Sequence, residues 1–309
     1  NGGVALNWDD GFANNANMSN MFAYSRAFNQ DISNWDLSNV TNMNSTFRDA
    51  SAFNNGGEPL DWDDGFGTDA NLTSMFNNAD AFNQDVSSWD LSNASQLQNM
   101  FSQSSAFDNG GVALNWDDGF ANNANISGMF FGATAFNQPI GTWVTSNVTN
   151  MSQLFFGATA FNQPIGNWNT SSVTNMSSMF QLAAAFNQPI GTWNIDKVTS
   201  MQRMFSGATN FNGELPTNRS SGVIPVLTNM GYMFYNAPAF NQDVSVLNVT
   251  NVTYMQHAFT NARAFNNADV PLNWGSETAK ITNWNNAFQG AIAFNNSGVE
   301  GWDMSSVTT

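Results

Sequence analysis

The chain has 309 residues and a formal net charge of −16, because only seven Lys and Arg residues offset 23 Asp and Glu residues. Phosphate backbones require basic patches, so this composition excludes nucleic acid as a partner and disfavours anionic membranes. The sequence contains no apolar run long enough to span a membrane and no basic-then-apolar signal segment at Asn1. With no cysteine, it has neither disulfides nor thiolate metal sites.

A pair of Phe residues six positions apart occurs eleven times along the chain. The second Phe of each pair follows the previous one after 25 or 29 residues, and a period of this size is typical of a solenoid of stacked coils. No coil could bury its apolar face alone, so we expect the pairs to form one continuous core in a single domain over residues 1–309. The clearest core positions are Phe47, Phe53, Phe76, Phe82, Phe101, Phe107, Phe155, Phe161, Phe180 and Phe186.

Each coil is predicted to contain a short helical turn and then a short strand. Val173, Met176, Phe180, Ala183 and Phe186 are spaced by 3, 4, 3 and 3 residues, which would place them on one face of a helix. The next segment, Asn-Gln-Asp/Pro-Ile/Val-x-x-Trp, is too short for a helix and is typical of a strand. The predicted fold is an α/β repeat, a right-handed solenoid of about eleven coils with one parallel sheet on its concave side and short helical turns.

The longer phrase Met-Phe-x-x-Ala-x-x-Phe-Asn-Gln-Asp/Pro-Ile-x-x-Trp-x-x-Ser-x-Val-Thr-x-Met runs from Met21 to Met43 and from Met179 to Met201, with one substitution in each. It resembles the repeat of BspA-type leucine-rich-repeat surface proteins, a repeat first catalogued in mycoplasma lipoproteins as a family of unknown function. The resemblance covers essentially the whole chain. It implies a leucine-rich-repeat-like curved solenoid on a cell surface or in secreted material, with no catalytic activity. Residues 213–226 and 266–281 depart from the pattern.

The sequences at the two ends of the chain follow the same repeat pattern as the rest. Residues 1–17 recur unchanged at 109–125, and neither end carries the polar cap that solenoids normally have. We therefore expect the chain to be a segment of a longer array, or to have its ends covered by other molecules.

An acidic residue follows the Trp in five successive coils, so these carboxylates should share one corner of the stack. Clustered carboxylates suit Ca²⁺, and a bound ion would relieve their repulsion. The alternative is that each carboxylate is hydrated or caps its own turn. The predicted metal ligands are Asp9, Asp36, Asp63, Asp90 and Asp117.

Other chemical signals are weak. His257 is the only histidine, there is no Cys/His pair and no Gly-rich phosphate loop, so we expect no enzyme and no cofactor other than calcium. Many Asn-x-Ser/Thr sequons arise from the turn chemistry of the repeat itself. Asn218, in an irregular coil, is the exception and is predicted as a possible glycosylation site.

These features favour an extracellular structural protein, the building block of a fibre, surface layer or adhesin stalk, which contacts copies of itself or other subunits through its ends. The alternative is a surface module that binds glycan or protein. An exposed row of Trp side chains could stack on sugars, but the same row could instead fill the core. Ice or mineral binding would need a regular Thr row, and the row is interrupted between Thr41, Thr149, Thr174, Thr199 and Thr253.

Overall fold

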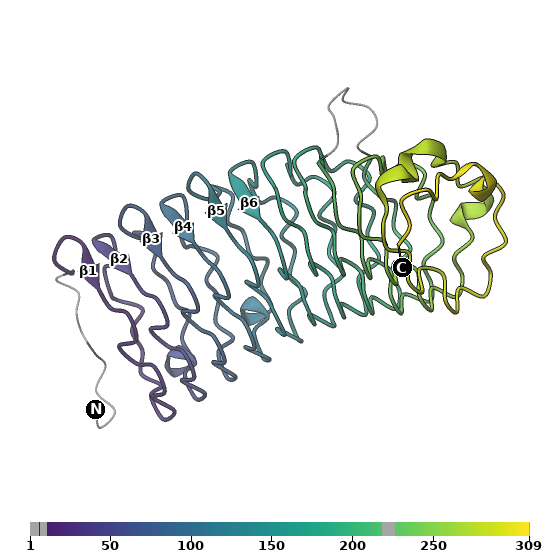
Figure 1. The fold of residues 1–309 in the computed structure, drawn as a ribbon. Coiled ribbons are helices and arrows are strands. Elements are labelled where there is room, and N and C mark those ends of the chain that lie inside the picture. Colours follow the sequence, from purple (N-terminus) through teal and green to yellow (C-terminus); the bar gives the residue numbers. More distant parts are fainter. Residues whose placement is uncertain (1–5, 7–10, 218–225, 309) are drawn as a thin grey trace.

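The structure is a computed structural model that describes residue 6 and residues 11–217 and 226–308. Successive repeats stack along one long axis from the purple N-terminal end to the yellow C-terminal end (Figure 1). A single hydrophobic cluster runs through the stack from Met18 to Ile281. The chain is therefore a solenoid-like array of repeated units around one continuous core.

One parallel sheet links the first half of the array. Its strand order follows the sequence, from β1 to β6, and each strand pairs in parallel with the next. The strands are β1 (Ala16–Asn17), β2 (Val40–Asn42), β3 (Ala70–Asn71), β4 (Ala94–Gln96), β5 (Ala124–Asn125) and β6 (Val148–Asn150). The ladder then continues as single parallel bridges, Asn150 to Asn175, Asn175 to Ser200, Ser200 to Asn229, Asn229 to Tyr254 and Tyr254 to Asn283.

The predicted position of the strand is wrong. The paired residues belong to the Val-Thr-Asn segment before the Met, whereas the Asn-Gln-Asp/Pro-Ile segment contains no strand. Side chains take the backbone donors of that second segment. The Ile32 N–H donates to Asn55 Oδ1 at 2.8 Å and the Ser33 N–H donates to Asp31 Oδ1 at 3.0 Å. In the middle coils Pro occupies the Asp position and has no N–H to offer a sheet.

The predicted helical turn is also wrong. The described residues contain no α-helix, and their only helical elements are short 3₁₀ segments at other positions. They are η1 (Asn55–Gly57), η2 (Asn109–Gly111), η3 (Asn267–Asp269), η4 (Gly275–Lys280) and η5 (Val299–Gly301).

Residues 176–186 instead form a ribbon of consecutive turns. The N–H groups of Ser178 and Phe180 donate to carbonyls of the next coil, while those of Met179 and Gln181 close turns within their own coil. Ser178 and Leu182 have positive φ, at 56° and 61°. Because the buried side chains of this ribbon recur at steps of three and four residues, as at Met176, Phe180 and Ala183, its apolar spacing imitates that of a helix.

The Phe side chains form two stacked columns inside the array. All ten Phe residues that the sequence selects as core positions are completely buried. Phe180 and Phe186 stack within one coil at 3.9 Å between ring centroids, and Phe155 and Phe180 stack between coils at 5.7 Å. Burial of an aromatic ring contributes roughly 1.5–3 kcal/mol, and stacking adds to it. These columns supply the repeated hydrophobic core.

Two polar ladders accompany the Phe columns. In the first, an Asn accepts a hydrogen bond from the backbone of the equivalent residue one coil later; Asn162 Oδ1, for example, accepts the Asn187 N–H at 2.9 Å. In the second, a Thr hydroxyl donates to the carbonyl of the previous Thr, as Thr199 does to Thr174 at 3.1 Å. Thr228 and Thr282 continue this second row, so it is uninterrupted from Thr149 to Thr308.

Candidate functional site

The Trp row lies in the core and not on the surface. Trp35, Trp62, Trp89, Trp116, Trp143, Trp168 and Trp193 are each at most 3% exposed. Their indole N–H groups donate to carbonyls of an earlier coil; Trp116, for example, donates to Val86 at 3.0 Å. A buried indole cannot stack on a sugar, so of the two alternatives for the Trp row the one in which it fills the core is confirmed. Trp8 lies outside the described residues.

The acidic column is divided between two kinds of turn. Asp36 accepts hydrogen bonds from the backbone and the hydroxyl of Ser38, at 2.9 and 2.6 Å, and Asp90 accepts one from the backbone of Ser92 at 2.8 Å. The Ser38 hydroxyl and then its N–H lower the pKa of the Asp36 carboxyl, because both bonds favour the charged form. These two carboxylates therefore cap their own turns.

Asp63 and Asp117 are exposed in the turn that follows Trp. The backbone of this turn approaches the next coil closely, since a Cβ on Gly65 (φ 72°) would lie 3.2 Å from Asp90 Cβ. Asp9 lies outside the described residues, as does Asn218. Within the described part of the chain, no group of three or more acidic or His side chains is close enough together to hold a metal ion. Calcium binding by this column stays a prediction.

His257 belongs to a surface stack. The centroid of its ring lies 4.6 Å from that of the Tyr232 ring. The Arg203 guanidinium also lies over the Tyr232 ring, 4.7 Å from its centroid. The imidazole Nδ1 is 3.2 Å from Thr260 Oγ1. These contacts give His257 a packing role at a turn whose φ is 55°.

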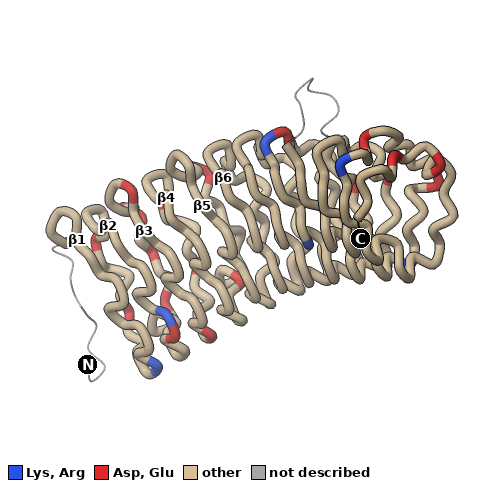
Figure 2. The backbone as a smooth tube through the Cα atoms, viewed as in Figure 1, with Lys and Arg blue, Asp and Glu red and all other residues tan. Residues whose placement is uncertain are grey.

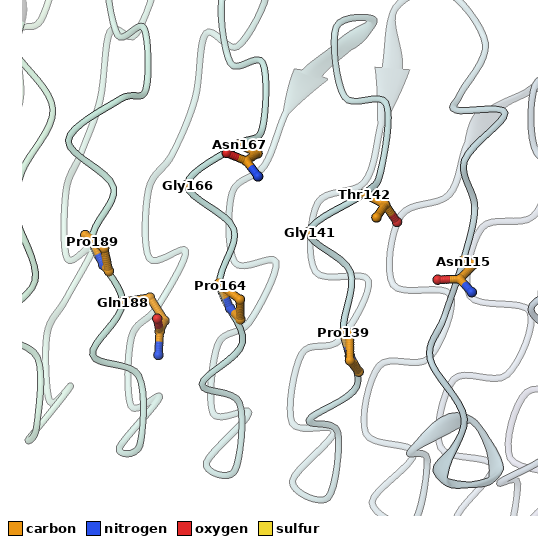
Figure 3. Close-up of a pocket in the computed structure, with 9 residues that line it drawn as sticks. All are labelled: Asn115, Pro139, Gly141, Thr142, Pro164, Gly166, Asn167, Gln188 and Pro189. Carbon is orange, nitrogen blue, oxygen red and sulfur yellow. The ribbon is translucent and has the colours of Figure 1, made fainter.

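A groove of about 410 Å³ crosses four neighbouring coils in the middle of the array (Figure 3). Pro139, Pro164 and Pro189 lie along it at equivalent positions of three coils, and their rings are exposed. Polar neutral side chains complete its lining, among them Asn115, Thr142, Asn167 and Gln188. The lining thus combines apolar rings with amide and hydroxyl groups and contains no charge.

The backbone of this groove carries donors without acceptors. In coils with Asp at the Pro position, the carboxylate accepts the N–H two residues later, as Asp85 does from Ser87 at 2.9 Å. The corresponding N–H groups in the Pro coils belong to Gly141, Gly166 and Gly191. None of these three N–H groups has an acceptor in the described part of the chain, although the Gly166 carbonyl accepts the Thr192 hydroxyl.

The repeat matches a known protein family. The family described as "Mycoplasma protein of unknown function, DUF285" matches residues 6–116, 61–138, 124–226 and 224–309, which together span nearly the whole sequence. The chain belongs to this family. No curated protein matches it.

In this DUF285 repeat array, the sequence carries a signal for the groove that lies outside its acidic and aromatic columns. Pro replaces Asp only in adjacent 25-residue coils, at positions 139, 164 and 189, and the aligned repeats display this replacement directly. What the aligned repeats could not show is that the Asp carboxylate caps a backbone donor.

Among the described residues, no helix is long and apolar enough to cross a membrane.

Proposed function

We propose that this chain is a non-enzymatic building block of an extracellular or cell-surface assembly, such as a fibre, surface layer or adhesin stalk. Copies of the chain, or further subunits, would meet end to end. The observation that carries the proposal is the complementarity between the two end faces of the array.

Most inter-coil hydrogen bonds of the turn ribbon have one direction, and the exceptions are residues such as Ala185, which donates to Thr159 of the preceding coil. Each coil donates N–H groups to carbonyls of the following coil, as Phe22 does to Thr46 and Phe259 does to Ala287, both at 2.8 Å. In the last described ribbon, the N–H groups of Asn286, Phe288 and Gly290 have no acceptor among the described residues. In the first ribbon, the carbonyls of Ser19, Met21 and Ala23 have no donor among those residues.

The C-terminal face therefore offers N–H donors and the N-terminal face offers carbonyl acceptors. A second copy placed one repeat further along the axis would pair these groups as successive coils do. The C-terminal face also has a hollow of about 470 Å³ whose apolar lining comes from Trp284, Phe288, Trp302 and Met304. A contact between unlike faces does not close on itself, so repetition produces a linear assembly. Unpaired edges of this kind favour pairing with another chain.

Light scattering and electron microscopy over a concentration series test the proposal. We expect the mass to grow with concentration and elongated particles to form. Met304→Glu should prevent this growth, because Met304 lines the terminal hollow and is 46% exposed. Val144→Glu is the matched control, since Val144 is also 46% exposed but lies on a middle coil. A monodisperse monomer at all concentrations, or equal effects of both variants, would contradict end-to-end assembly.

We also infer a finer classification of the fold. The 25- and 29-residue period and the continuous parallel ladder support a right-handed, leucine-rich-repeat-like solenoid of about eleven coils of the BspA type. The alternative function is a surface module that binds a ligand on the side of the array. The groove beside Pro139, Pro164 and Pro189 favours this alternative.

A further inference from the structure

We propose that the groove along Pro139, Pro164 and Pro189 binds a neutral, linear glycan that lies parallel to the solenoid axis. This site gives the binding-module alternative a definite location. It does not depend on end-to-end assembly, because its residues lie on the middle coils.

The first argument is the row of free backbone donors. Asp31, Asp85 and Asp243 each place a carboxylate oxygen on the N–H two residues later, at 2.8 to 3.0 Å. Pro removes that oxygen from three successive coils and leaves the N–H groups of Gly141 and Gly166 open in the groove, whereas Gly191 lies beside the Glu214 carboxylate at its end. A ligand oxygen in the place of the missing carboxylate would make the hydrogen bond that Asp makes in the other coils.

The second argument is the chemistry of the lining. The exposed pyrrolidine rings offer apolar surface to the C–H faces of a sugar. The side-chain polar atoms of Asn115, Thr142 and Asn167 have no partner among the described residues and can exchange hydrogen bonds with hydroxyl groups. A few placed polar groups among apolar surface are typical of a small-molecule site.

The third argument is charge. No Asp, Glu, Lys, Arg or His occurs between residues 119 and 195, and the middle coils are accordingly uncoloured in Figure 2. An anionic polymer would find no cation here and would be repelled by the net charge of −16. A cationic ligand would find its partners at the acidic ends of the array. The groove therefore suits a neutral ligand.

The fourth argument is repetition along the axis. Phe136, Phe161 and Phe186, each three residues before a groove Pro, stack from coil to coil at 5.9 and 6.0 Å. The same Pro ring therefore recurs at regular steps, and a linear chain of identical units can meet the same groups on each coil.

Isothermal titration with cellohexaose and xylohexaose tests the site, with polygalacturonate as the anionic comparison and a neutral Ser/Thr/Gly peptide as the peptide comparison. The decisive variant is Pro139→Asp with Pro164→Asp and Pro189→Asp. It should fold, because Asp occupies the same position in other coils, and its carboxylates should cap the three glycine donors. We expect its Kd for the neutral glycan to rise about tenfold or more.

Asp243→Pro is the matched control, because it makes the same exchange outside the groove, and it should leave the Kd unchanged. Three outcomes would overturn the proposal: no binding of either neutral hexasaccharide, an unchanged Kd in the triple variant, or binding of the peptide in preference to the glycans. Met304→Glu should have no effect on glycan binding, so failure of this site and failure of end-to-end assembly are distinguishable.

Discussion

Asp36 shows how a single side chain stabilises a turn through local hydrogen bonds. Its carboxylate accepts two hydrogen bonds from Ser38, and these bonds lower its pKa relative to that in the unfolded chain. A carboxyl group with a lowered pKa in the folded state contributes stability above its unfolded pKa. That contribution is lost as the pH falls through the folded pKa.

We expect Ser38→Ala to reduce the free energy of unfolding near neutral pH by less than about 1 kcal/mol, because water competes at this partly exposed site. The difference between the variant and the parent should disappear in acid, where Asp36 is protonated in both. Urea unfolding at several pH values measures this difference in the free energy of unfolding. A deficit that persists unchanged at low pH would mean that Ser38 acts without the Asp36 charge.

Calcium binding by the acidic column predicts a different response. A chelator should lower the melting temperature and added calcium should restore it, since a ligand that binds only the folded state stabilises it. Asp63→Asn combined with Asp117→Asn should abolish this response, because both carboxylates are exposed and available to an ion. An identical melting curve with and without excess chelator would leave the carboxylates as hydrated turn residues.

Backbone conformation sets a second demand on residues of the turn ribbon. Gly157 has a φ of 67°, and a Cβ added there would find ordinary space, 3.8 Å from Gly132 Cα. We expect Gly157→Ala to destabilise the protein by about 1 kcal/mol for backbone reasons alone. Gly157→Asn should cost less, because Asn tolerates positive φ. Equal losses in both variants, measured by denaturant unfolding, would point to a steric cause.

At the scale of the coil, the Asn ladder determines how neighbouring repeats align. Asn162 Oδ1 accepts both the Asn187 N–H at 2.9 Å and Gln188 Nε2 at 3.0 Å. Asp108 occupies the equivalent position two coils earlier and accepts the Asn137 N–H at 2.8 Å. The ladder therefore requires an acceptor oxygen and tolerates either side chain.

Asn162→Ala should lower the free energy of unfolding by about 1 kcal/mol, because two donors lose their acceptor. Asn162→Asp keeps the acceptor and should change it by no more than about 0.5 kcal/mol. Thermal or urea unfolding of both variants checks this difference. If Asp proves as harmful as Ala, the charge at this position matters more than the acceptor.

The sequence predicts the repeat period and the buried Phe pairs because both are expressed by side-chain type at fixed spacing. It misplaces the secondary structure because buried residues at steps of three and four, such as Met176, Phe180 and Ala183, fit a helix and a turn ribbon equally well. The Thr row looks interrupted in the sequence because the longer coils displace Thr228 and Thr282 along the chain but not in space. The free N–H of Gly166 could not be predicted from the sequence. It becomes evident only once the structure shows that the Asp of other coils, such as Asp85, accepts the corresponding N–H.

At the scale of the whole molecule, charge is gathered toward the ends (Figure 2). Asp31, Asp36 and Asp49 lie in early coils, and Glu277, Glu300 and Asp303 lie in the last ones. Two molecules that meet end to end must bring these like charges together. Their repulsion opposes the contact that the open backbone groups favour.

End-to-end association should therefore strengthen when salt rises from about 10 mM to about 150 mM, because the screening length falls from about 30 Å to about 8 Å. Sedimentation at both ionic strengths measures the change. Glycan binding at the uncharged middle coils should be insensitive to the same change. Association that weakens with salt would indicate attraction between opposite charges and a different contact surface.

The orientation of the inter-coil hydrogen bonds also has a mechanical consequence. Because these bonds join each coil to its two neighbours along the axis, a pull on the two ends loads the coils in series, and the terminal coil, which has only one neighbour, gives way first. A released coil of 25 residues extends from about 4.8 Å of stacked height to roughly 85 Å of open chain. A rod built in this way resists bending through its continuous Phe columns, yet under tension it lengthens step by step and dissipates the load without breaking a covalent bond.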